Sequence, residues 1–169
     1  MIISPSNKRS LPWWFAALVL LSIVVASVLP EVPEKRWQMT LTLVGASAAF
    51  IYFLYSQHLE ETRMFRELFV TFNERYDKLN ERLNKLVMQP EPRSLTPEDT
   101  RLLYDYFNLC AEEYYFYRLG YIPEEVWTAW RMGMQIFLAT SCVRELLTAE
   151  LATGSYYGLT LDKIKSGGR

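Results

Sequence analysis

The chain has 169 residues, of which 50% are apolar and 22% are charged, and its formal net charge is −1. From residue 56 onward, 14 Lys and Arg stand against 17 Asp and Glu, a net charge of −3. This mildly acidic balance lacks the broad basic field by which proteins bind duplex nucleic acid. The sequence contains no CxxC, HExxH, GxSxG, GxGxxG or P-loop motif, so we expect no catalytic residues, no metal and no cofactor.

Two uncharged apolar runs cover residues 11–29 and 37–55. A helix of this length spans about 28 Å, close to the hydrocarbon thickness of a bilayer. Aromatic residues of the kind found at membrane interfaces stand near the ends of the runs: Trp13, Trp14, Trp37, Tyr52 and Tyr55. The residues between the runs, PEVPEKR, predict a tight turn. We therefore expect residues 1–55 to form a transmembrane hairpin.

The charges around the first run predict the orientation of this hairpin. Lys8 and Arg9 favour a cytoplasmic N-terminus, and a hairpin returns the chain to the same side of the inner (cytoplasmic) membrane. A cleaved signal peptide is the alternative, but no small-x-small cleavage site follows the run and a second span begins at once. Cys110 and Cys142 lie in apolar helical patterns, and we interpret them as small buried residues of a cytoplasmic domain and not as a redox or metal pair.

Residues 56–89 contain no helix breaker and predict a long connecting helix. Their apolar residues alternate four and three apart, as in a heptad repeat: Phe65, Phe69, Phe72, Tyr76, Leu79, Leu83 and Leu86. This spacing favours a parallel coiled coil or bundle between subunits, with an amphipathic helix packed on its own domain as the alternative. Arg75, Asn80 and Arg82 flank the seam, where Arg could bind phosphate and Asn could read an adenine edge. A flank that only contacts solvent is the alternative.

Residues 90–169 form the expected small cytoplasmic helical domain, which starts in the proline-rich segment PEPRSLTP. Thr96, followed by a proline and two acidic residues, predicts a helix N-terminus, and Gly120 predicts the end of that helix. The helices should cover residues 97–119, 123–140 and 141–152. The last seven residues, KIKSGGR, should be loose.

Aromatic residues are dense in YYFYRLGYIPEEVWTAW, residues 114–130. Rings at helical spacing usually form a core, and a small domain benefits from large buried side chains. Four tyrosines fall off the apolar stripes and could be exposed: Tyr104, Tyr115, Tyr156 and Tyr157. An exposed ring beside Arg118, Arg131 or Arg144 could stack on a base while the guanidinium holds a phosphate. Ordinary surface tyrosines are the alternative.

Two acidic doublets, at residues 112–113 and 124–125, could be considered as acid/base pairs. Neither is accompanied by a nucleophile, a histidine or a metal site, so we expect the protein not to be an enzyme. Glu113 lies between apolar stripes, which favours a buried pairing with an arginine.

Three segments carry a resemblance to known proteins: TFNERYDKLNERL (71–83), YDYFNLCAEEYYFYRLGYIPEEVWTAW (104–130) and GSYYGL (154–159). They resemble small bacterial proteins with two N-terminal spans and a cytoplasmic helical domain of unknown function. In size and layout the chain also resembles the membrane effectors of type III CRISPR antiphage defence that respond to cyclic tetra-adenylate. That resemblance implies a homo-oligomer, a tetramer in those effectors, that binds the cyclic nucleotide and perturbs membrane lipid.

The sequence therefore predicts an all-α protein with a membrane hairpin, a long connecting helix and a small helical domain. The predicted function is that of a non-enzymatic antiviral effector that binds a cyclic oligoadenylate and does not bind duplex nucleic acid. The candidate ligand-binding residues are Arg75, Asn80, Arg82, Arg118, Arg131, Arg144, Tyr156 and Tyr157. The alternative is a membrane-anchored protein–protein interaction module without a nucleotide ligand.

Overall fold

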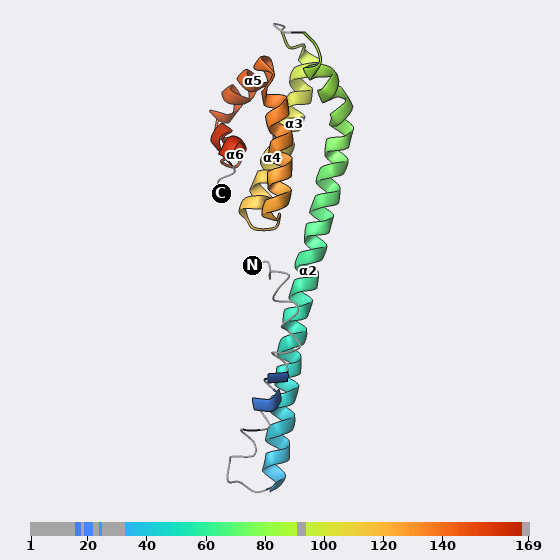
Figure 1. Cartoon of the computed structure of the whole chain (residues 1–169), viewed down its shortest axis with the longest axis vertical. Helices are drawn as coiled ribbons and strands as arrows, with labels where there is room; N and C mark the ends of the chain where they lie inside the picture. The colour runs from blue at the N-terminus through green and yellow to red at the C-terminus, as the bar shows by residue number, and fades with distance from the viewer. Residues whose placement is uncertain (1–15, 18, 22–23, 25–32, 91–93, 167–169) are drawn as a thin grey trace. The chain divides into compact units, whose positions relative to one another are not determined.

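The computed structural model describes residues 16–17, 19–21, 24, 33–90 and 94–166 (Figure 1). This part of the chain is helical and contains no strand, which confirms the all-α class. From residue 33 onward the helices are α2 (Pro33–Val87), α3 (Pro97–Arg118), α4 (Glu124–Leu138), α5 (Ser141–Leu151) and α6 (Leu161–Ser166). The chain divides within α2 into two compact units, Met1–Arg63 and Met64–Arg169.

The first half of α2 contains the second expected span, residues 37–55, which is helical throughout. Among the described residues, α2 is the helix that is long and apolar enough to cross a membrane. Its apolar side chains are exposed, including Trp37 at 72% and Tyr52 at 73%, which suits a segment surrounded by lipid. Most of the first expected span, residues 11–29, lies outside the described residues.

Part of the segment that was expected to form a turn between the two spans is helical. The segment PEVPEKR covers residues 30–36, but α2 already begins at Pro33. Proline fits the first turn of a helix because its fixed φ is helical and its missing N–H would have no partner there. The last four residues of the expected turn are therefore helical.

The apolar seam of α2 packs inside the Met64–Arg169 unit. Phe72, Leu83 and Leu86 are buried, whereas Phe65, Tyr76 and Leu79 are partly buried against the same core. Helices α3 and α4 cover the seam (Figure 1): the ring centroid of Phe72 lies 5.9 Å from that of Phe116 and 5.8 Å from that of Trp130. A heptad pattern needs only an apolar partner surface, and here the same chain supplies it. The structure thus supports an amphipathic helix packed on its own domain over a coiled coil between subunits.

Helix α3 begins and ends as its sequence indicates. The hydroxyl of Thr96 accepts a hydrogen bond from the backbone N–H of Asp99, and the Asp99 carboxylate accepts one from the N–H of Thr96, which completes a capping box. Gly120 follows the helix with a φ of 86°, a conformation that costs glycine little. Helices α4 and α5 lie within the predicted ranges.

The aromatic segment, residues 114–130, forms the centre of the Met64–Arg169 unit, which we call the helical unit. Tyr114, Tyr117 and Trp127 are at most 1% exposed. The ring of Tyr117 stacks on that of Trp127 at 5.1 Å with an interplanar angle of 15°. The hydroxyl of Tyr117 donates a hydrogen bond to Glu124, which satisfies one member of the second acidic doublet. The expectation that most of these rings are core residues is therefore confirmed.

Two expectations for the C-terminal region are wrong. Tyr156, expected as one of the exposed tyrosines, is 6% exposed and its hydroxyl donates a hydrogen bond to Glu150. The residues KIKS, expected to be loose, belong to α6, because Ile164 is fully buried and anchors the helix against the core. Of the two free cysteines, Cys110 is buried and Cys142 half-buried, and burial raises the pKa of the Cys110 thiol and makes it unreactive.

Candidate functional site

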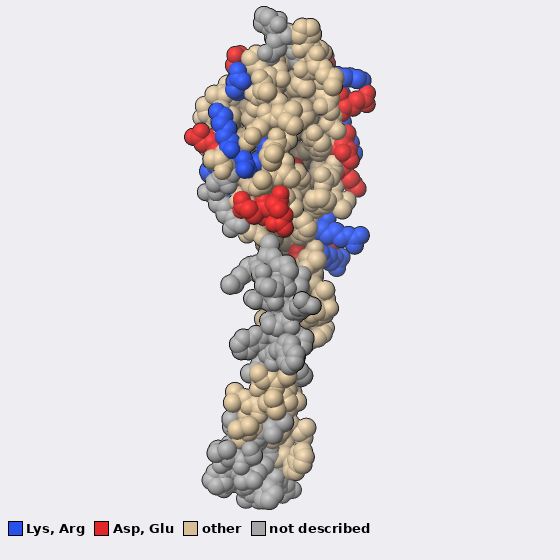
Figure 2. Space-filling model, in the orientation of Figure 1, with Lys and Arg blue, Asp and Glu red and all other residues tan. Residues whose placement is uncertain are grey.

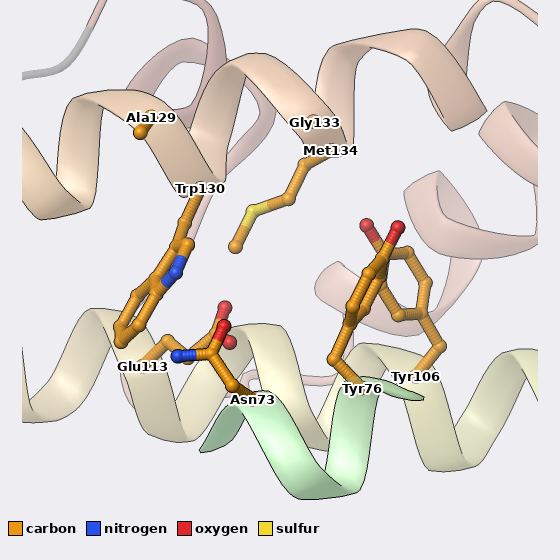
Figure 3. A pocket seen from close by; sticks show the side chains of 8 residues that line it. All are labelled: Asn73, Tyr76, Tyr106, Glu113, Ala129, Trp130, Gly133 and Met134. Atoms are coloured by element: carbon orange, nitrogen blue, oxygen red, sulfur yellow. The ribbon is translucent and has the colours of Figure 1, made fainter. Parts of the chain in front are cut away.

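A cavity of about 190 Å³ lies between three helices of the Met64–Arg169 unit. Its lining residues are Asn73 and Tyr76 of α2, Tyr106 and Glu113 of α3, and Ala129, Trp130, Gly133 and Met134 of α4. In Figure 3, Trp130 lies on one side and the two tyrosines lie on the other, with the polar ends of Glu113 and Asn73 between them. The site therefore combines aromatic walls with one acidic group.

Among the described residues, Glu113 is the one with an ionisable acidic or basic side chain that is buried, with 6% of its surface exposed. Its side chain makes no hydrogen bond to another described residue. Burial raises the pKa of its carboxyl group from 4.5 to about 8, the positive charge of Arg75 opposes this rise, and the negative charge of Glu112 adds to it. At neutral pH the carboxyl group of Glu113 is therefore mostly protonated.

The neighbouring carboxylate, Glu112, has the arginine partner that the sequence suggested for Glu113. Arg75 makes two hydrogen bonds to Glu112, of 2.5 and 3.1 Å, and this pairing raises the pKa of the guanidinium. Consecutive residues of a helix point about 100° apart. The guanidinium therefore meets Glu112 near the surface, and Glu113 turns into the core without it.

Stacked rings hold the aromatic wall of the cavity in place. Phe69 stacks on Trp130 at 6.0 Å with an interplanar angle of 17°, and Phe72 meets the same indole edge-on at 5.8 Å. On the other side, the ring of Tyr106 lies 6.4 Å from that of Tyr76 and 5.2 Å from that of Phe137. Sequence reasoning did not assemble this site, although the acidic doublet at 112–113 inside an apolar pattern was a signal for one of its members.

The eight residues predicted from the sequence to bind ligand do not converge on this cavity. Arg131 donates hydrogen bonds to the carbonyl oxygens of Ile164 and Lys165, and Arg144 donates to those of Leu138 and Ala139. These two arginines complete the C-terminal ends of α6 and α4, where carbonyl groups lack helical partners.

The predicted residues on α2 also lie apart from the cavity. Arg75 is paired with Glu112, and the Asn80 side-chain oxygen accepts a hydrogen bond of 2.7 Å from Asn84. Arg82 is exposed. The predicted group on α2 thus has one member in an ion pair, one in a local hydrogen bond and one in solvent.

Two predicted residues, Arg118 and Tyr157, meet at the surface through Tyr115. The guanidinium of Arg118 lies 5.7 Å from the centroid of the Tyr115 ring, and that ring lies 5.1 Å from the ring of Tyr157. Arg118 is exposed, Tyr157 is 52% exposed, and no carboxylate of the described chain pairs with Arg118. We call Tyr115, Arg118 and Tyr157 the tyrosine–arginine cluster.

The backbone at Tyr157 adopts a conformation unusual for its residue type. Its φ is 52°, and Gly154 and Gly158 nearby also have positive φ. A side chain larger than that of Asn or Asp in this region is strained by about 1–3 kcal/mol, and such strain is found most often at functional sites. The GSYYG segment thus holds the Tyr157 ring against Tyr115 at an energetic cost.

Separate small groups of acidic and basic side chains lie on the mostly uncharged face of the helical unit shown in Figure 2. This agrees with the absence of a broad basic field in the composition. Comparisons with protein-family models, curated proteins and solved structures found no match to this chain.

Proposed function

We propose that the chain is a non-enzymatic membrane effector whose helical unit binds a cyclic oligoadenylate, with cyclic tetra-adenylate as the best candidate, and thereby perturbs the bilayer. The observation that carries the proposal is the tyrosine–arginine cluster. An exposed ring can stack on an adenine base while an exposed guanidinium holds the adjacent phosphate. Identical chains around a closed ring would present the same group to each repeat of a cyclic ligand.

The long helix α2 supports the second half of the proposal. It begins in the apolar segment that can cross a membrane and continues into the helical unit, where its seam contacts α3 and α4. Arg118 and Tyr115 lie near the end of α3, so ligand contacts there act on a helix that packs on α2. A shift from about 1% to 99% of the active state requires about 5.5 kcal/mol of differential affinity, which stacking and phosphate contacts in several subunits could supply.

The experiment measures binding and leakage with the same full-length protein. We expect cyclic tetra-adenylate to bind the protein in phosphatidylglycerol nanodiscs by calorimetry and to release dye from liposomes that contain it. Tyr157→Gly should weaken binding roughly 5- to 150-fold, because stacking on one base contributes about 1–3 kcal/mol. Arg118→Gln should also weaken binding, because it removes the charge that holds the phosphate. Glycine adopts the φ of residue 157 without strain, so Tyr157→Gly should leave the fold intact.

Arg101→Gln is the matched control, because Arg101 is an exposed arginine on α3 outside the cluster. It should bind and release dye like the wild type. Cyclic tri- and hexa-adenylate test the ring size. If both cluster variants bind the ligand as tightly as the wild type, the ligand site is not the tyrosine–arginine cluster. If the wild type binds the ligand but releases no dye, the effector mechanism is wrong.

The alternative function, an interaction module without a nucleotide, has its own support in α4. Met132 and Ile136 of this helix are 58% and 69% exposed, and they lie one turn apart. Four of the five arginines considered above do not join the tyrosine–arginine cluster. If none of the cyclic oligoadenylates binds, this alternative becomes the better hypothesis.

A further inference from the structure

We propose that the cavity lined by Glu113, Trp130 and Tyr76 binds a small organic ammonium ion, such as a quaternary or methylated amine. The proposal is independent of the oligoadenylate function, because the cavity and the tyrosine–arginine cluster share no residue. It identifies a chemical class of ligand by the groups that line the site.

The first argument is the unpartnered acid. Glu113 is 6% exposed, borders the cavity, and within the described chain has no hydrogen-bond partner. A buried ionisable group without a partner is unfavourable unless a counter-charge or hydrogen-bond donor meets it. The one nearby cation, Arg75, is held by Glu112 in a bidentate pair. A ligand that carries a positive charge would supply the missing partner.

The second argument is the aromatic surround. Trp130, Tyr76 and Tyr106 line the cavity from two sides (Figure 3). Aromatic faces attract organic cations through the ring quadrupole, and tryptophan does so best. The thioether of Met134 adds a soft, polarisable contact from α4. Aromatic walls around one carboxyl group are the combination that favours an alkylated ammonium over a hydrated inorganic ion.

Size and charge exclude other ligand classes. A protein cavity of about 150 Å³ accommodates benzene, so about 190 Å³ accommodates a molecule of choline's size and not a whole nucleotide. The lining contains no Lys, Arg or His to hold a phosphate. A divalent metal would need several acidic or His ligands, and the described residues contain no such group of three.

The protonation of Glu113 makes affinity for a cation depend on pH. The groups around it are Arg75 and Tyr76 on α2, and Tyr106, Cys110 and Glu112 on α3, whereas α4 contributes only neutral side chains to the cavity. Because the pKa of Glu113 is raised to about 8, binding of a cation must displace its proton at lower pH. Affinity should therefore rise roughly tenfold per pH unit up to about pH 8 and level off above it.

The test uses the full-length protein in phosphatidylglycerol nanodiscs, which contain no amine headgroup. Choline is the probe, and 3,3-dimethylbutan-1-ol is its uncharged isostere. We expect choline to bind with proton release and with the stated pH dependence, and the isostere to bind at least tenfold more weakly. A parallel titration with glycerophosphocholine separates the sources: tighter binding than choline assigns the site to a lipid headgroup, and weaker binding assigns it to a free amine.

Glu113→Gln should weaken choline binding at least tenfold at pH 8.5 and abolish its pH dependence, while Glu145→Gln, an exposed change of the same chemistry on α5, should change neither. Trp130→Leu provides a second variant that keeps the acid and removes the ring, and it too should weaken binding. The proposal is overturned if the uncharged isostere binds as tightly as choline, or if choline shows no binding at millimolar concentration at pH 8.5.

Discussion

Leu83→Ala should lower the free energy of unfolding of the helical unit by about 2–5 kcal/mol, because Leu83 is fully buried and its truncation leaves a cavity. The loss should appear as a lower midpoint of denaturant or thermal unfolding of the full chain in maltoside micelles. The midpoints of wild type and variant should also be independent of the ratio of protein to detergent. That independence distinguishes an intramolecular seam from a coiled coil, whose stability depends on protomer concentration.

Leu59→Ala is the matched control for this prediction. Leu59 lies on the same helix but is 51% exposed, so its truncation should change the free energy of unfolding by about 0.5 kcal/mol or less. Two results would contradict this prediction and support a coiled coil between subunits. One is an equal effect of the two substitutions, and the other is an unfolding midpoint for Leu83→Ala that rises strongly with protein concentration.

Glu113→Gln should change how the stability of the helical unit depends on pH. In the wild type, the raised pKa of about 8 means that the folded state binds the Glu113 proton more tightly than the unfolded state, whose carboxyl has a pKa near 4.5. The stabilising contribution is fully present below pH 4.5 and is lost as the pH rises to about 8, with a slope of up to ~1.4 kcal/mol per unit. Glutamine stays neutral, so the variant should lack this slope.

The measurement is the free energy of unfolding from pH 5 to 9 for wild type, Glu113→Gln and Glu145→Gln. At pH 5 the first two should have similar stability, because the wild-type carboxyl group is protonated there. At pH 9 Glu113→Gln should be the more stable by several kcal/mol, because the same linkage destabilises the wild type there. The Glu145→Gln curve should follow the wild type. A Glu113→Gln curve parallel to the wild type would show that the carboxyl group has another partner.

Much of the helical arrangement could be predicted from local chemistry. Thr96 and the acids after it encode a capping box, and Gly120 encodes the end of α3, because these effects act within a few residues of the chain. The length and absence of charge in residues 37–55 predict a helix able to cross a membrane for the same local reason. The aromatic stripes of α3 and α4 predict a core, since helical spacing puts their rings on shared faces.

The sequence could not predict which helices pack against these apolar faces. A periodic pattern indicates that one face of a helix is apolar, but it does not indicate which other element covers that face. The heptads of α2 suit a second subunit as well as α3 and α4. Likewise, the sequence shows that residues 112 and 113 are both glutamates, but it does not show which of them binds Arg75. Consecutive side chains on a helix point about 100° apart, so the position of α3 relative to α2 decides this. The wrong expectations for Tyr156 and for KIKS have a similar cause, since Tyr156 and Ile164 belong to a core that also contains residues from α2 to α5.

The sequence by itself determined the helical class, most helix ends, the membrane-length apolar segment and the aromatic content of the core, because each depends on residues close together along the chain. Only the tertiary structure decided that the α2 seam packs within its own unit, that Arg131 and Arg144 bind backbone carbonyls, and that Glu113 lies unpaired beside Trp130 and Tyr76. These outcomes depend on contacts between helices. Which side chains make those contacts is decided by close packing and by the free-energy cost of burying polar groups, and both involve residues far apart in the sequence.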